Sequence, residues 1–256
     1  MKSKVFFYLL LIAAFLYTNP VFSQQQTSDS LWKNTRKNII RYNLSGALLF
    51  GFDKYIIFGY ERVIKPHQSF SINVGGAGLP KLVSITSDSF QLQKDTKNSG
   101  FNISADYRFY LPNENKYNAP HGLYIGPYIS YNQFDRNNEW SFQESSSNQK
   151  IISTEVKFNI FTAGAELGYQ FVFWKRVTLD MVLIGPGISG YNLKGKVAGD
   201  LTDEQRSNLQ EALKQLISQK FPGMNYVFAD KEFNANGVIN TTSIGFRYLI
   251  HIGFNF

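Results

Sequence analysis

The chain has 256 residues and a formal net charge of +7, and it contains no cysteine. The lack of cysteine excludes a disulfide framework, a thiolate metal site and the lipid-attachment residue of an exported lipoprotein. The basic residues are scattered and not gathered in runs, so the charge does not indicate a nucleic-acid interface. The 23 Phe, 15 Tyr and 20 Gly favour β-structure with tight positions inside it.

The first residues have the pattern of a secretory signal peptide. Two lysines precede an apolar run over 5–17, and small residues follow near Ser23. We therefore predict a signal peptide over 1–23 that is cleaved after Ser23, which implies export. The apolar run is about 13 residues long and too short for a membrane-spanning helix, which needs about 20. The polar segment 24–37 lacks periodicity and is expected to form a periplasmic tail.

From residue 38 to the end, apolar and polar residues alternate almost without interruption, which is typical of strands that separate two environments. The clearest case is "FNISADYRFYL" at 101–111. The alternation predicts eight strands, at 38–51, 54–64, 68–77, 99–111, 121–133, 157–173, 176–191 and 243–256. Connections of mostly alternating length favour an antiparallel, all-β barrel over 38–256 with short turns at one end and long loops at the other. Ten strands are the alternative, because "LVSITSDSFQLQ" and "IISTEVKF" could pair as hairpin extensions.

The composition of the two faces indicates which one is inside. The polar face is rich in Gly, Ser and Asn, small residues that fit the interior of an eight-stranded barrel. The other face carries Phe, Tyr, Ile and Leu, which suits lipid. Aromatic residues near the short-turn end, among them Tyr124, Tyr169 and Trp174, are expected to form an interfacial girdle. A transmembrane barrel is therefore predicted, with a soluble lipocalin-like barrel as the alternative.

The last strand is amphipathic up to the final residue of the sequence. Its apolar phase holds Tyr248, Ile250, Ile252, Phe254 and Phe256. We expect this strand to close on the first one, because every backbone group in lipid must be paired. These residues resemble the C-terminal signal that the barrel-assembly machinery of bacteria reads.

With the signal peptide and the eight strands, the chain resembles the small outer-membrane barrels of the OmpA-transmembrane-domain and OmpX type. The segment "NLSGALLFGFDKYIIFGYERVIKPHQSFSINVG" is further similar to barrel families of gliding and gut Gram-negative bacteria. The resemblance implies the outer membrane of a Gram-negative bacterium, with lipid and the assembly machinery as partners. The even number of strands and the short turns place both termini in the periplasm.

Charged residues on the inward phase form the candidate site. They are Arg41, Glu61, Asp106, Arg108, Glu166, Asp180, Arg247 and His251. Buried charges need partners, so a structural ion network that fills the lumen is the first interpretation. A proton or ion path, a gated pore and a catalytic site are the alternatives. The three histidines are far apart and none is placed near the outer rim, which disfavours a lipid-modifying enzyme; no metal or cofactor site is expected.

The last long loop carries a helical signal, "LTDEQRSNLQEALKQLISQKFPG". Thr202 is a suitable N-cap and Gln205 its reciprocal partner. Leu209, Leu213 and Leu216 lie on one stripe at helical spacing. We expect these leucines to be contact residues, either of a lid over the barrel mouth or of a surface that docks a partner or the outer leaflet.

The sequence therefore predicts a non-enzymatic outer-membrane protein with a structural or surface-interaction role. An extracellular ligand or protein of unknown identity is a further expected partner, and nucleic acid is not. A narrow channel for ions or small solutes is the alternative, and a lipid-modifying enzyme is less favoured.

Overall fold

The computed structural model describes residues 36–78, 90–145, 148–198, 202–220, 227–228 and 237–256. They belong to one compact unit, Asn34–Phe256. The predicted signal peptide and almost all of the predicted tail lie outside the described residues.

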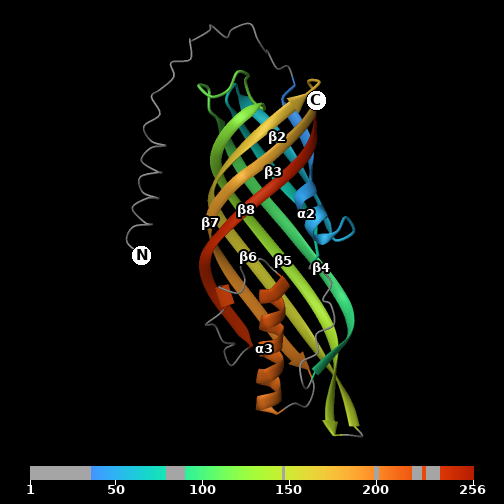
Figure 1. Cartoon of the computed structure of the whole chain (residues 1–256). Coiled ribbons are helices and arrows are strands. Elements are labelled where there is room, and N and C mark those ends of the chain that lie inside the picture. The colour runs from blue at the N-terminus through green and yellow to red at the C-terminus, as the bar shows by residue number, and fades with distance from the viewer. Residues whose placement is uncertain (1–35, 79–89, 146–147, 199–201, 221–226, 229–236) are drawn as a thin grey trace, which may run out of the picture. The chain divides into compact units, whose positions relative to one another are not determined.

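Eight antiparallel strands close into a barrel in the order in which they occur along the chain (Figure 1). They are β1 (Asn38–Asn43), β2 (Tyr55–Lys65), β3 (Gln68–Ala77), β4 (Phe90–Tyr110), β5 (Gly122–Ser145), β6 (Asn148–Phe173), β7 (Val177–Ala198) and β8 (Val238–Asn255). The last strand pairs with the first, so the ring has no free edge at this end. The prediction of an all-β barrel of eight strands is confirmed. Of the two segments behind the ten-strand alternative, "IISTEVKF" is part of β6 and the described end of the other is part of β4.

Four strands extend well beyond their predicted ends. Residues 90–98 and the described residues between 133 and 157 are strand where loops were expected, and β5 and β6 pair without a break from Gly122–Gln170 to Gln143–Gln149. We call the end of the barrel where Asn38 bonds to Phe256 the near end. The opposite end, where β5 ends and β6 begins, is called the far end. The predicted strands stop short of the far end, because the strict apolar alternation that was used to recognise strands fades toward that end.

The first predicted strand is wrong beyond Asn43, where helix α2 (Leu44–Phe50) replaces it. The Asn43 side-chain oxygen accepts hydrogen bonds from the backbone N–H of Gly46 and the hydroxyl of Ser45, both at 3.0 Å. This is the N-cap interaction that starts a helix. Gly51 ends α2 with a positive φ of 100°, a conformation that glycine adopts at no steric cost.

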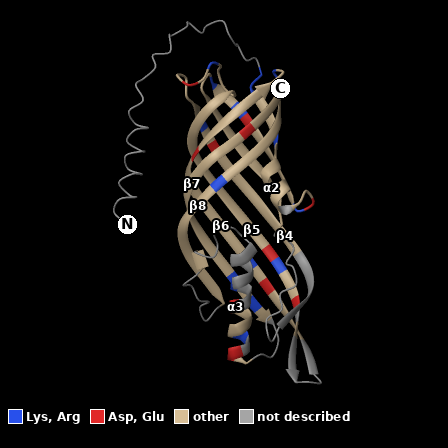
Figure 2. Cartoon of the chain, in the orientation of Figure 1, with Lys and Arg blue, Asp and Glu red and all other residues tan. Residues whose placement is uncertain are grey.

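The faces of the barrel are arranged as predicted, with apolar side chains outward and polar ones inward. Ile40, Phe58 and Phe246 are 51%, 53% and 58% exposed, whereas Arg41 and Asp106 are buried. In Figure 2 most of the visible strand surface between the two ends is free of acidic and basic residues. A barrel in water would bury the apolar face, so this arrangement is that of a barrel that spans a membrane. No helix of the described residues is long and apolar enough to cross a membrane.

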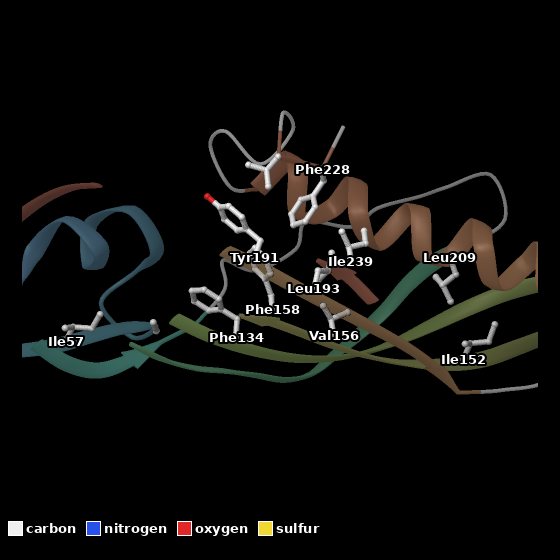
Figure 3. Packing of buried hydrophobic residues seen from close by; sticks show 12 residues of the cluster. Ile57, Phe134, Ile152, Val156, Phe158, Tyr191, Leu193, Leu209, Phe228 and Ile239 are labelled. Atoms are coloured by element: carbon white, nitrogen blue, oxygen red, sulfur yellow. The ribbon is translucent and has the colours of Figure 1, made fainter. Parts of the chain in front are cut away.

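Toward the far end, the inward face carries a buried apolar cluster beside the buried polar side chains of Arg136, Asn138 and Thr154. Helix α3 (Asp203–Lys220) lies beside these strand ends and contacts β7 (Figure 1). Leu209 of α3 and Phe228 pack with inward side chains of β5–β8 in one buried cluster (Figure 3). The rings of Phe158 and Tyr191 are stacked there, with centroids 6.3 Å apart. The far end thus has a core of the kind found in soluble proteins.

Candidate functional site: a charged network in the lumen

The structure brings all eight predicted lumen residues together in one network of ion pairs. They come from β1, β2, β4, β6, β7 and β8. Their alternate positions in the strands direct the side chains inward. The small residues between them, such as Gly59 and Ser71, leave the space that the long arginine side chains occupy.

Arg41 connects the walls of the barrel. Its Nη1 lies 3.1 Å from Asp180 Oδ2, and its Nη2 lies 3.2 Å from Asp106 Oδ2. Its Nε donates to Asn73 Oδ1 at 3.0 Å, and Nη2 also donates to the Ser71 hydroxyl. With every nitrogen engaged and the side chain 1% exposed, the guanidinium is held in one position.

Arg108 lies beside Arg41 and shares its partners. Its Nε is 2.6 Å from Asp106 Oδ1 and its Nη2 is 2.8 Å from Asp180 Oδ2. Glu61 is 3.5 Å from Nη1. The guanidinium also lies 4.4 Å from the ring centre of Tyr124, a cation–π contact. Two arginines against three carboxylates make a compact network in which each charge has an opposite neighbour.

Several residues of this network were not among the predicted ones. Gln170 and Ser69 donate hydrogen bonds to Glu61, and the Tyr110 hydroxyl lies 2.7 Å from Gln170 Oε1 and 3.1 Å from Glu61 Oε1, either of which can accept its one proton. Tyr124 was expected in the outer girdle, and this is wrong: it is fully buried and its hydroxyl donates to Asp180 Oδ1 at 2.7 Å. The inward phase of β5 could have placed Tyr124 correctly. A buried tyrosine needs a hydrogen-bond partner, and the carboxylate supplies it.

Arg247 and Glu166 form a second pair on the far side of the network. Their closest atoms, Nη2 and Oε2, are 2.9 Å apart, and Arg247 also lies 3.5 Å from Asp106. Its guanidinium covers the ring of Tyr128 at 4.4 Å. Arg247 Nε and Nη1 make no hydrogen bond to the residues that the structure describes. This arginine is therefore less tightly held than Arg41.

The histidines lie far from one another in the fold. His251 belongs to the network, with Nδ1 3.2 Å from Asp180 Oδ2. His67 follows β2, and His121 precedes β5 outside the membrane-spanning strands. Partial burial lowers the pKa of His121. Within the described residues no three His, Asp or Glu side chains are grouped so as to hold a metal ion.

An aromatic layer closes the lumen on the near side of the network. Val63, Tyr110, Ala119 and Tyr124 form a buried cluster, and the two tyrosine rings lie 5.5 Å apart. Arg108, Tyr110 and Tyr124 are each at most 1% exposed. At this level the described side chains of the network and of this layer pack together across the lumen.

On the far side of the network the lumen contains a cavity of about 600 Å³. Its lining combines many polar side chains, among them four tyrosines, with apolar atoms that make up most of the surface exposed to the cavity. It includes Asn43, Tyr55, Asn102, Ser104, Tyr128, Ser130, Asn132, Thr162, Ser189, Tyr191 and Arg247. The apolar cluster adjoins the cavity through Tyr191 and Ile160. The lumen thus has four successive zones: an aromatic layer, a charged network, a cavity of mixed lining and a far-end core that contains the apolar cluster.

The remaining predicted residues lie on the outside and at the far end. The five apolar residues of the predicted C-terminal signal all face outward on β8 and the residue after it, and are 36% to 60% exposed. Leu209 of α3 is fully buried. The side chains of Leu213 and Leu216 lie outside the described part of the structure. Through Leu209, helix α3 packs against the buried cluster at the far end, as expected of a lid.

No protein-family model matches the sequence, and a search of curated proteins finds no match. Among solved structures, the chain is similar to CarO2 of Acinetobacter baumannii with 11% identity and a TM-score of 0.35. The similarity covers 86% of this chain and 98% of that one. A likeness at this level carries no argument about function. The resemblance to barrels of the OmpA and OmpX type stays a prediction.

Proposed function

We propose that the chain is a non-enzymatic outer-membrane protein of a Gram-negative bacterium, inserted by the barrel-assembly machinery with both termini in the periplasm. The outward apolar band and the amphipathic last strand support the membrane placement. The far end then faces the cell exterior, with its strand extensions and helix α3.

The observation that carries the proposal is the closed lumen. Arg41 and Arg108 span the interior and bind carboxylates of β2, β4 and β7, and the tyrosine layer covers the near side. An eight-stranded barrel has an interior only wide enough for side chains, and at the level of the network large ones fill it. Such a barrel is a rigid support for what lies above it. We therefore assign the role to the far end, as a structural or surface-interaction element that meets an extracellular ligand or protein.

Two measurements test this function. The protein should fractionate with the outer membrane and migrate faster on a gel before boiling than after it, because a folded barrel resists detergent. The absence of both properties would refute the membrane placement. Overexpression should leave the lipid A profile of the cells unchanged, and a changed profile would show an enzyme.

A narrow channel is the second candidate function, and the cavity of about 600 Å³ favours it. A path from this cavity to the near end requires Arg108 and Tyr124 to move together. Regular single-channel steps that are altered by Glu166→Ala or Arg247→Ala would favour this function.

A further inference from the structure

The barrel wall has a seam between β8 and β2, where α2 takes the place of a strand. The ladder of β1 with β8 ends at Asn43–His251, and the ladder of β1 with β2 ends at Tyr42–Phe58. β8 itself continues to Val238, paired with β7 on its other edge. Helix α2 contacts both β8 and β2. The edge of β8 on the N-terminal side of His251 therefore meets this helix.

Helix α2 meets the edge of β8 through a side chain of its first turn. The backbone N–H of Ile250 donates to the hydroxyl of Ser45 at 3.3 Å, on the edge of β8 that pairs with β1. The backbone groups of Phe246 and Tyr248 point to the same edge, since alternate residues of an antiparallel strand do so. In lipid these backbone groups need hydrogen-bond partners, so α2 must cover the seam while no ligand enters. At Ile250 a side-chain hydroxyl stands in the place that a backbone group of a strand would take.

The seam lies within the apolar band. Leu48 and Leu49 of α2 are 63% and 76% exposed, and Phe52 after it is 57% exposed. Phe246 and Tyr248 on the neighbouring strand are exposed to a similar degree. A molecule that reaches this seam therefore comes from the membrane and not from the aqueous phase.

The cavity lies directly behind the seam. Asn43 and Tyr55 line it on one side and residues 245–249 of β8 on the other. The side chains of Phe246 and Tyr248 point outward, so their presence in the lining shows that the cavity reaches the edge of the strand. Tyr55 also packs against α2, since a Cβ at Gly46 would overlap its ring. Movement of α2 would thus uncover the cavity.

We propose that the cavity binds the head group of a single-chain amphiphile with an uncharged, oxygen-rich head, which enters from the outer leaflet between α2 and β8. A cavity of about 600 Å³ is in the usual range of small-molecule sites, about 300–1,000 Å³. Its amides, hydroxyls and four tyrosines suit hydroxyl or carbonyl groups, and its apolar atoms suit the adjoining carbons of an amphiphile. This inference rests on the proposed membrane placement and does not depend on the lumen being closed to ions.

The charges of the lumen favour an uncharged head. Three arginines face four carboxylates in the network, which disfavours an added anion. Arg247 is the charged residue in the lining of the cavity, which disfavours a cation. Its Nε and Nη1, without hydrogen bonds to described residues and on a side chain 10% exposed, can donate to a neutral oxygen of the ligand.

The test uses the full-length mature protein in phospholipid nanodiscs and an alkyl glucoside with a photoreactive diazirine. A diazirine in the head should label Ser130, Asn132 or Thr162, and one near the middle of the chain should label α2 or Tyr248, as mapped by mass spectrometry. Probes with the same chain and a carboxylate or trimethylammonium head should label the cavity at least 10-fold less. Diazirine-labelled glucose without a chain should not label it, because it cannot enter through lipid.

Two variants separate the site from its entrance. Ser130→Trp fills the cavity and should reduce head-group labelling about 10-fold, whereas Arg62→Gln on the outer surface should leave it unchanged. The chain lacks cysteine, so Ser45→Cys with Ile250→Cys gives a unique pair that should cross-link α2 to β8. Oxidation should abolish labelling, and a reductant should restore it.

Equal labelling by free glucose, or labelling unaffected by the cross-link, would overturn entry from the membrane. Stronger labelling by a charged probe, or labelling unaffected by Ser130→Trp, would overturn the assigned head group or site. Failure of the two cysteines to cross-link would show that α2 does not lie at the seam. A protein that stays heat-modifiable and inserted but labels nowhere in the cavity would refute this inference alone and leave the proposed function intact.

Discussion

At the scale of single residues, the charged network limits what the lumen can tolerate. An ion pair in a dry interior adds little net stability, because both charges lose their water. Removal of one partner is different, since it leaves the opposite charge buried and uncompensated. Arg108 contacts three carboxylates at once and is fully buried, so it is the most sensitive position of the network.

We predict that Arg108→Met lowers the free energy of unfolding by about 3–5 kcal/mol, the usual cost of breaking a buried pair. Arg62→Met is the matched control, because Arg62 is exposed on the outside of β2. Urea unfolding in lipid vesicles, followed by the mobility of the unboiled band, measures both. Equal stability of the two variants would show that the network is not a structural one.

A second prediction concerns close approach of the strands inside the barrel. A Cβ at Gly126 would overlap the backbone carbonyl oxygen of Tyr107, whereas a Cβ at Gly190 would meet nothing within 4 Å. Gly126→Ala should therefore destabilise the barrel by about 1–3 kcal/mol through overpacking. Gly190→Ala should change stability by less than about 1 kcal/mol. The same unfolding assay compares them, and a neutral Gly126→Ala would contradict the packing described for β4 and β5.

The phase of a strand predicted the eight charged residues, because the side-chain period of two leaves only two faces to choose from. The identity of their partners was not predictable in this way. Tyr124 was misplaced because aromatic residues near a barrel end are often interfacial, and here the carboxylate of Asp180 outweighed that tendency. The contact of Gln170 with Glu61, 109 positions apart, depends on the curvature of the closed barrel.

At the scale of elements, the prediction failed where two periodicities compete. "NLSGALLF" alternates well enough for a strand, but Asn43 can cap a helix and Leu44 and Leu48 are also at helical spacing. The extensions of β5 and β6 were missed for another reason. Their outward face changes from apolar to polar toward the far end, so a membrane-strand pattern no longer recognises them. The inward face still marks them, through Phe134, Val156 and Phe158.

Helix α3 should be dispensable for assembly. The strands that close the barrel are paired without it, and Leu209 is its described contact with the apolar cluster. Deletion of residues 201–223 should leave heat-modifiability intact, while limited proteolysis should cut the far ends of β5 and β6 faster. Loss of assembly would show that α3 belongs to the folding core. If assembly survives but a cell-surface partner captured by the intact protein is lost, α3 acts as a docking element as well as a lid.

At the scale of the whole molecule, the barrel reverses its polarity along its axis. The charged network lies where the outside is apolar, and the apolar cluster lies where the outside of the strands is more polar. A membrane-inserted part and a part with a soluble-type core are thus built from the same continuous strands. The charged network lies near one end of this structure, so it closes the path through the membrane on the near side of the cavity.

The conductance of the purified protein in a planar lipid bilayer tests the closed lumen most directly. The wild-type protein, shown to be folded by its heat-modifiable band, should give no regular single-channel steps. The variant Arg108→Ser with Asp180→Ser removes one charge of each sign and two large side chains from the network, and it should conduct. Regular steps from the wild-type protein would contradict the account, because they would require an open path past Arg108 and Tyr124.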